Sequence, residues 1–252
     1  MYRRIFTLNY LYKNTEKNVR KLDGYCKTRI DKAWGNAYNK NASILRKKGE
    51  ITMYITCLDM EGVLVPEIWI AFAEATGIPE LKKTTRDEPD YDKLMNYRLD
   101  ILREHHLGLS EIQKTIAGID PIPGAREFLD ELRSFCQVII LSDTFEQFAG
   151  PLIEKLGRPT IFCNTLDVAA DGSITGYQMR CPQSKLTTVR ALQSIGYDTI
   201  ASGDSFNDLG MILASKAGFL FKSTESIKEE YPQIPAFDAY DDLLAAIKKA
   251  MV

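Results

Sequence analysis

Apolar and polar positions follow two different periods along the chain from residue 54 onward. Short apolar runs at 54–58, 137–141 and 198–202 are typical of buried strands, because each is too brief for a helix. Longer segments between them have apolar residues at the spacing of one helix face. Alternating strands and helices predict an α/β fold with a doubly wound, mostly parallel Rossmann-like sheet covered on both faces.

Weaker patterns complete this architecture. A further short strand is predicted at 160–163, and residues 165–179 have the alternation of a hairpin that turns at Asp171 and Gly172. In a sheet of this kind the chemistry is expected at the carboxyl ends of the strands. Helical periodicity predicts helices at 125–134, 145–156, 184–195, 206–214 and 240–250.

The stretch between the first two strands is too long for a simple crossover connection. Residues 67–120 have helical period almost throughout, with one polar loop at 84–90. We therefore expect residues 67–121 to form a small helical cap inserted over the site. The Rossmann-like catalytic core then consists of residues 53–66 and 122–252.

The first 52 residues differ in composition from the rest of the chain. Residues 1–50 contain 13 Lys and Arg against 4 Asp and Glu, although the net charge of the whole chain is −2. A basic arm for anionic partners and an organelle transit peptide are two interpretations. We favour a third, in which translation starts at Met53, because Lys48-Gly49-Glu50 can be encoded by a purine run resembling a ribosome-binding site. Residues 1–52 are accordingly predicted to be a disordered extension or a wrongly assigned start.

Composition argues against several classes of function. The chain has 252 residues, of which 45% are hydrophobic and 26% charged, as is ordinary for a soluble enzyme. The slightly acidic balance argues against nucleic-acid binding, and no apolar run is long enough to span a membrane. Five cysteines without a CxxC pair, beside only two histidines, argue against a zinc site. They fit reduced thiols in a cytoplasmic protein.

The most informative string, Asp59-Met60-Glu61-Gly62, follows the first predicted strand. Residues two apart in extended chain project to the same side, so Asp59 and Glu61 are expected to stand together above the strand end. Such a pair can divide the work of phosphoryl transfer. One carboxylate attacks phosphorus, while the other protonates the departing alcohol and later deprotonates water.

A second acidic string, Gly203-Asp204-Ser205-Phe206-Asn207-Asp208, lies between the predicted strand at 198–202 and the next helix. Asp204 and Asp208 can therefore reach one point above the sheet. Carboxylate oxygens in this number suit Mg²⁺, and neighbouring carboxylates could not all ionise without a cation. The sequence thus predicts a magnesium site at Asp59, Glu61, Asp204 and Asp208.

Two further residues supply groups that can bind a phosphate: the hydroxyl of Ser142 at a strand tip and the ammonium of Lys185 at a helix start. Each candidate taken alone has an ordinary interpretation. Ser142-Asp143-Thr144 is typical of a helix N-cap cluster, and Lys185 of a solvated helix residue. Their joint occurrence in order, at strand ends, favours a phosphoryl-transfer site.

The same residues carry a family resemblance. Asp59-x-Glu61-Gly62, Ser142, Lys185 and Gly203-Asp204-x₃-Asp208 resemble the four ordered motifs of haloacid dehalogenase superfamily phosphatases. The resemblance begins at Met53, and most members of the superfamily have Asp where this chain has Glu61. The strings CLDMEGVLVPEIWIAFAEATGI, TTRDEPDYDKLM, VIILSDTFEQF and ASGDSFND are similar to the bifunctional phosphoserine phosphatase/phosphoserine–homoserine phosphotransferases.

The resemblance implies a role for each of these positions. Asp59 is expected to be the nucleophile, and Glu61 the acid/base, with its backbone carbonyl also on Mg²⁺. Asp204 is expected to be a metal ligand, and Asp208 and Asn207 to support the metal and phosphate site. The implied activity is a Mg²⁺-dependent phosphatase that also uses homoserine as a phosphoryl acceptor.

The implied substrate, phosphoserine, needs partners for its ammonium and carboxylate groups. Glu67 and Arg98 resemble the cap residues that bind these two groups, and Arg86 competes with Arg98 for the carboxylate. The ordinary interpretation is a solvated helix face. A phosphatase of another small phosphomonoester and a non-catalytic phosphate-binding module stay as alternatives. A homodimer through the cap or the sheet edge is compatible with the sequence.

Overall fold

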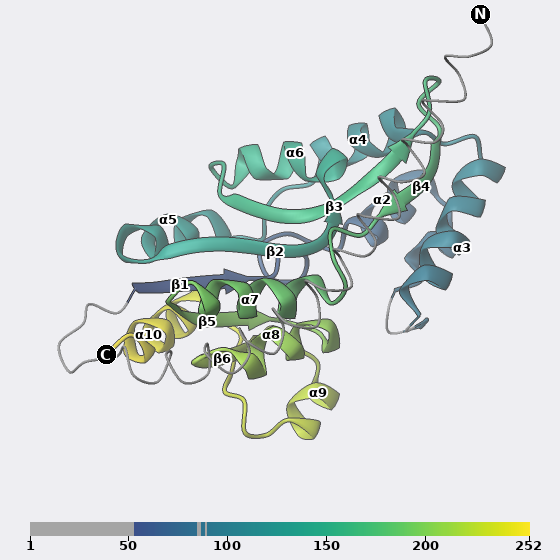
Figure 1. Cartoon of the computed structure of the whole chain (residues 1–252). Coiled ribbons are helices and arrows are strands. Elements are labelled where there is room, and N and C mark those ends of the chain that lie inside the picture. Colours follow the sequence, from purple (N-terminus) through teal and green to yellow (C-terminus); the bar gives the residue numbers. More distant parts are fainter. Residues whose placement is uncertain (1–52, 85–86, 89) are drawn as a thin grey trace, which may run out of the picture. The chain divides into compact units, whose positions relative to one another are not determined.

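The computed structural model describes residues 53–84, 87–88 and 90–252 (Figure 1). The described residues belong to one compact unit. The predictions made for residues 1–52 and for Arg86 therefore lie outside the described residues.

A seven-stranded sheet lies at the centre of the described fold, in the order β4-β3-β2-β1-β5-β6-β7. Neighbouring strands are parallel except for the antiparallel pair β3–β4. The predicted α/β class with a mostly parallel sheet is confirmed. The strands are β1 (Met53–Leu58), β2 (Gln137–Phe145), β3 (Thr160–Val168), β4 (Ile174–Gln178), β5 (Tyr197–Gly203), β6 (Ala217–Phe221) and β7 (Ala236–Phe237).

Helices pack on both faces of this sheet because its strands send alternate side chains to opposite sides. Ile139 and Leu141 of β2 join Val189 in one buried cluster, whereas Ile140 joins Leu129 in the other. Figure 1 shows α5 and α6 on the opposite side of the sheet from α7 and α8. The core helices are α5 (Ala125–Phe135), α6 (Glu146–Lys155), α7 (Ser184–Ser194), α8 (Leu209–Ala214), α9 (Glu225–Glu230) and α10 (Tyr240–Ala250).

Helices fill the insertion between β1 and α5: α2 (Ile68–Thr76), the 3-10 turn η1 (Pro79–Lys82), α3 (Tyr91–Glu104) and α4 (Leu109–Ala117). The two ends of the insertion meet where the Ile122 N–H donates to the Leu64 carbonyl, at 2.9 Å. Buried residues of the insertion, such as Met95 and Ile116, belong to the main hydrophobic cluster. The limits 67–121 for a separate cap stay a prediction.

Three predicted elements differ from the structure in extent. The strand predicted at 137–141 continues to Phe145, so Ser142 lies inside β2 and not at its tip. The strand at 160–163 and the first arm of the hairpin are one strand, since β3 pairs first with β2 and then with β4. The predicted helix at 206–214 is divided into a 3-10 turn η2 (Phe206–Asp208) and α8, because the Asp208 carboxylate folds back onto the N–H groups of Asp204 and Ser205. No described helix combines the length and apolar character that crossing a membrane requires.

Candidate active site

The carboxyl ends of β1, β2 and β5 surround a cavity of about 560 Å³. Parallel strands end at the same edge of a sheet, so residues far apart in the sequence meet there. The insertion contributes part of the wall through α2 and α3. The cavity is lined by the predicted site residues Asp59, Glu61, Glu67, Arg98, Ser142, Lys185, Asp204 and Asn207, and by Tyr91 and Asp143.

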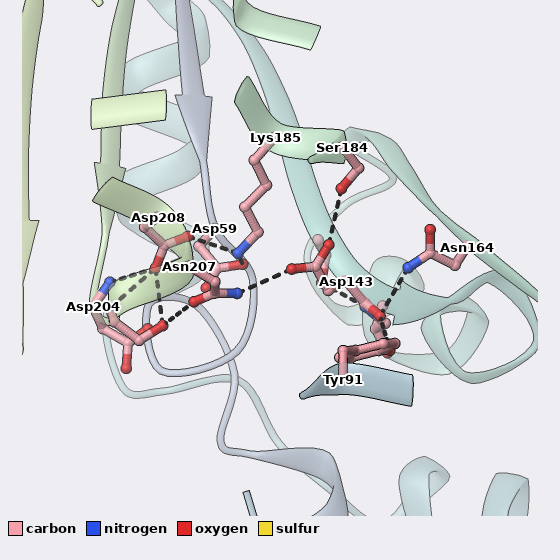
Figure 2. A network of polar contacts seen from close by, with 12 residues as sticks. Asp59, Tyr91, Asp143, Asn164, Ser184, Lys185, Asp204, Asn207 and Asp208 are labelled. Atoms are coloured by element: carbon pink, nitrogen blue, oxygen red, sulfur yellow. Dashed lines mark hydrogen bonds and ion pairs between the residues drawn. The ribbon is translucent and has the colours of Figure 1, made fainter. Parts of the chain in front are cut away.

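Lys185 is the charged centre of the cavity floor (Figure 2). Its Nζ lies 2.8 Å from Asp59 Oδ1 and 2.6 Å from Asp208 Oδ1, and all three side chains are buried. Burial alone lowers the pKa of Lys185, but the two carboxylates outweigh this and raise it above its ordinary value. Lys185 therefore stays charged and neutralises part of the acidic cluster.

Asp208 organises the loop after β5. Its Oδ2 accepts hydrogen bonds from the backbone N–H groups of Asp204 and Ser205, both at 3.1 Å. A Cβ on Gly203 would overlap the Asp208 carboxyl group, so this approach requires glycine. The capped turn directs Asp204 toward Asp59.

Asp59, Asp204 and Asp208 form a compact acidic cluster whose ligand atoms lie within 4.8 Å of one another. Burial and the carboxylates of Asp208 and Asp204 raise the pKa of Asp59 well above its ordinary value, against the opposing effect of Lys185. Gly62 allows the turn after β1 to come close to this cluster. Its φ is +77°, and a Cβ there would lie 2.5 Å from Asp204 Oδ2. Three hard oxygen donors held this closely fit a divalent cation such as Mg²⁺.

Glu61 lies two residues beyond Asp59 at the edge of the same cavity. Its Oε2 accepts a hydrogen bond of 2.9 Å from the backbone N–H of Ile68. Burial and the nearby Glu67 raise the pKa of Glu61 to about 7, against the opposing effects of the Ile68 N–H, Arg98 and Lys185. A carboxyl group that titrates near neutrality can both give and take a proton.

Ser142 reaches the cavity from within β2, and Asn207 from the turn η2 that follows β5. Ser142 is buried within β2, and its Oγ accepts a hydrogen bond from the Thr144 N–H at 3.2 Å, which leaves its own hydroxyl proton available. Asn207 is exposed in the turn η2, and its Nδ2 donates to Asp143 Oδ2 at 3.0 Å. Both side chains line the same cavity as Asp59.

Arg98 is a buried cation in the cavity wall. Its Cζ lies 4.5 Å from the centre of the Trp69 ring, and its Nη2 donates to the Lys83 carbonyl at 2.8 Å. Burial lowers the pKa of Arg98 to about 10. Its Nε has no hydrogen-bond partner among the residues that the structure describes. Glu67, which precedes α2, is half-buried and lines the same cavity.

Comparison with known families now bears on this geometry. Residues 56–216 match the haloacid dehalogenase-like hydrolases. The chain belongs to this family. It is therefore an enzyme of a hydrolase family, and the resemblance inferred from its four motifs is confirmed.

Two curated relatives of this hydrolase cover most of its length. It is 52% identical to the phosphoserine phosphatase ThrH of Pseudomonas aeruginosa, over 79% of this chain and 97% of the relative. It is 49% identical to a phosphoserine phosphatase of Pseudomonas syringae pv. tomato, over 82% of this chain and 87% of the relative. A solved substrate-bound phosphoserine phosphatase complex has the same fold, with a TM-score of 0.64 at 23% identity, and covers 79% of this chain and 99% of that one.

Two residues of the site in this hydrolase were missed at the level of sequence. The Asp143 carboxylate accepts hydrogen bonds from Asn207 and from Ser184 Oγ, the latter at 2.9 Å. Burial raises the pKa of Asp143, but Lys185 and these two donors outweigh burial and lower the pKa below its ordinary value. Its carbonyl accepts from the Tyr91 hydroxyl at 3.0 Å. Asp143 was missed because its string is typical of a helix N-cap. Tyr91 lies seven positions before Arg98, and this helical spacing could have indicated that both residues line the site.

Proposed function

We propose that this hydrolase is a Mg²⁺-dependent phosphoserine phosphatase that works through an aspartyl-phosphate on Asp59 and also transfers phosphate to homoserine. The buried Arg98, whose Nε lacks a partner among the described residues, carries the substrate assignment. A buried cation with an unused donor favours an anionic ligand, and guanidinium binds a carboxylate through paired hydrogen bonds. The two Pseudomonas relatives named phosphoserine phosphatase support the same assignment.

The acidic cluster fits Mg²⁺ by its donor chemistry. Asp59 and Asp204 would hold the ion together with the Glu61 carbonyl. Asp208 lies in the same cluster, but both of its oxygens already accept hydrogen bonds. When bound, the ion would neutralise charge on the phosphate and on the clustered carboxylates. Lys185 contributes to the same neutralisation from the opposite side of Asp59.

The first half of the reaction uses the two carboxyl groups that follow β1. An Asp59 oxygen attacks phosphorus, the bond from phosphorus to the serine oxygen breaks, and protonated Glu61 gives its proton to that oxygen. The pKa of Glu61, at about 7, supports this double use. Ser142, Asn207 and Lys185 would bind the phosphate oxygens. Arg98 and Glu67 would bind the carboxylate and ammonium groups of serine.

The second half returns the enzyme to its starting state. Ionised Glu61 takes a proton from the attacking hydroxyl, that oxygen bonds to phosphorus, and the bond to Asp59 breaks. Water as acceptor gives inorganic phosphate. Homoserine is one methylene longer than serine and carries the same ammonium and carboxylate groups, so Glu67 and Arg98 can position it as an alternative acceptor. The cavity of about 560 Å³ is of the size that binds small molecules.

Phosphate release from O-phospho-L-serine by the full chain tests this proposal. We expect release with Mg²⁺, none with excess chelator, and none from Asp59→Asn. Adding homoserine should divert part of the phosphate into O-phosphohomoserine. Turnover of para-nitrophenyl phosphate without any turnover of phosphoserine would refute the substrate. Turnover that survives Asp59→Asn would refute the mechanism. The homodimer and the cytoplasmic location stay predictions.

A further inference from the structure

Helix α3 presents two cavity residues on one face. Tyr91 is its first residue and Arg98 lies seven positions later, which is close to two helical turns. Both line the cavity, so the position of α3 determines where the Arg98 guanidinium lies relative to Asp59. A contact that fixes the start of α3 against the core therefore also fixes Arg98.

The Tyr91 hydroxyl makes such a contact. It donates to the backbone carbonyl of Asp143 at 3.0 Å, across 52 positions of sequence. The same carbonyl accepts a hydrogen bond from Asn164 Nδ2, also at 3.0 Å, so both of its lone pairs are used. Figure 2 shows the Tyr91 side chain pointing at Asp143 from α3.

Asp143 is the residue at which the loops of the site are joined. Its carboxylate holds Ser184, the neighbour of Lys185, and Asn207, the neighbour of Asp208. The Tyr91 hydroxyl thus connects the insertion to the residue that already links the phosphate-binding loops. Two other hydrogen bonds, from Tyr177 Oη to Asp92 and from the Leu109 N–H to the Gly172 carbonyl, join α3 and α4 to the β3–β4 hairpin, and Gln113 of α4 donates to the Gln147 carbonyl of α6.

The ring of Tyr91 is held independently of its hydroxyl. It packs edge-on against the Tyr177 ring at 5.9 Å between centroids, and Tyr177 in turn packs against Phe145. Removing only the oxygen should therefore leave the aromatic packing in place. The substitution would then remove only the hydrogen bond that the hydroxyl of this half-buried side chain donates to the Asp143 carbonyl.

We propose that Tyr91 is a positioning residue whose hydroxyl, held by the Asp143 carbonyl, sets Arg98 at the distance from Asp59 that an amino-acid phosphate requires. This inference rests on the proposed function, since it gives Arg98 the substrate carboxylate. It assigns to Tyr91 selectivity for the amino-acid head of the substrate and no part in the bond-breaking step.

The test compares Tyr91→Phe with Tyr177→Phe, which removes the hydroxyl that donates to Asp92 at the same end of α3. Each variant is assayed with O-phospho-L-serine and with para-nitrophenyl phosphate, which has no carboxylate for Arg98. We expect Tyr91→Phe to lower kcat/KM for phosphoserine about tenfold, mainly through KM, and to leave para-nitrophenyl phosphate unchanged. Tyr177→Phe should change neither. The proposal would be overturned if Tyr91→Phe left the ratio of kcat/KM for phosphoserine to kcat/KM for para-nitrophenyl phosphate unchanged, or if both variants changed this ratio equally.

A double substitution separates positioning from a loss of folding. If Tyr91 acts through Arg98, Tyr91→Phe should cost little further phosphoserine activity in an Arg98→Met background. A full additional loss there would overturn the proposal. Should the wild-type protein cleave only para-nitrophenyl phosphate, the proposed substrate has failed. Amide exchange of α3 then decides the positioning role: faster exchange in Tyr91→Phe than in Tyr177→Phe supports it, and equal exchange refutes it.

Discussion

Lys185 Nζ lies 2.8 Å from Asp59 Oδ1, and both side chains are buried at the carboxyl edge of the sheet. The same ammonium group lies 2.6 Å from Asp208. One cation therefore balances two carboxylates that come from different strands, β1 and β5. The ammonium group opposes the effects of burial and of the acidic neighbours, which still raise the pKa of Asp59 well above its ordinary value.

Replacing Lys185 by Met should impair both activity and stability. The substitution leaves Asp59 and Asp208 buried without their cation, and breaking a buried pair from one side typically costs about 3–5 kcal/mol. We expect kcat to fall about a hundredfold or more, because the phosphate also loses a positive contact. Thermal unfolding and phosphate release measure the two effects. Lys216→Met is the control, since the exposed Lys216 pairs with the buried Asp198 at 3.4 Å and neither residue lines the cavity.

An unchanged unfolding midpoint in Lys185→Met would show that the buried pair does not stabilise the fold. If Lys216→Met gave the same loss of activity, the effect would belong to surface charge and not to the site.

Gly203→Ala should disorganise the loop that carries Asp204. The added Cβ would overlap the Asp208 carboxyl group, which holds both Lys185 and the backbone of Asp204. We expect a loss of stability of about 1–3 kcal/mol from overpacking and a loss of Mg²⁺-dependent turnover of at least about tenfold. Calorimetric titration with Mg²⁺ and unfolding in urea measure these effects.

The matched control is Gly150→Ala in α6, where a new Cβ would have no neighbour within 4 Å. This change should stabilise the protein by about 0.5–1 kcal/mol, since alanine is the better helix former. Full activity in Gly203→Ala would refute the role given to the Asp208 turn.

Local strings predicted the floor of the site because the acidic ones follow strands. Asp59, Asp204 and Asp208 meet in the structure since parallel strands place their carboxyl ends at one edge, and Lys185 joins them from the start of α7. The hairpin and the helices on both faces of the sheet were predicted from periodicity, whereas the order of the strands was not. The individual roles assigned to these residues stay predictions.

The upper wall of the site was less predictable. Tyr91 meets Asp143 because the start of α3 lies beside the carboxyl end of β2, and no local pattern encodes a contact between segments so far apart. Asp143 stands in a string that is typical of a helix cap, so its sequence context suggested an ordinary role. The segment after β5 is divided into η2 and α8 because the Asp208 carboxylate accepts a hydrogen bond from the backbone of Asp204. Hydrophobic periodicity does not indicate such a bond.

Replacing Arg98 should separate recognition of the amino acid from phosphoryl transfer. Lys at this position keeps the charge but loses the planar pair of donors and the stacking on Trp69. We expect Arg98→Lys and Arg98→Met to raise KM for phosphoserine about a hundredfold. Hydrolysis of para-nitrophenyl phosphate should change little. Initial rates over a range of concentrations of each substrate measure the ratio of the two kcat/KM values. Equal losses of kcat/KM on both substrates would contradict the role of Arg98 in binding the carboxylate.

The Asp143 carboxylate should contribute stability that depends on pH. Burial raises its pKa, but Lys185, Asn207 and Ser184 outweigh this and lower it below the ordinary value of about 3.9. A depressed pKa in the folded state stabilises the protein above the pKa of the unfolded chain, and this stability is lost as the pH falls through the folded pKa.

Asp143→Asn should therefore be less stable than the wild-type protein at pH 7, by about 1–3 kcal/mol from the lost charge-assisted hydrogen bonds. The difference should shrink as the pH falls below about 4, since the wild-type carboxylate then takes up a proton and loses the same interactions. Unfolding in urea at a series of pH values, with chelator present to exclude metal effects, measures the difference. If the difference in free energy of unfolding between the two proteins stayed constant down to pH 3, the charge of Asp143 would contribute nothing to stability. The side chain would then stabilise the loops only through its packing and its uncharged hydrogen bonds.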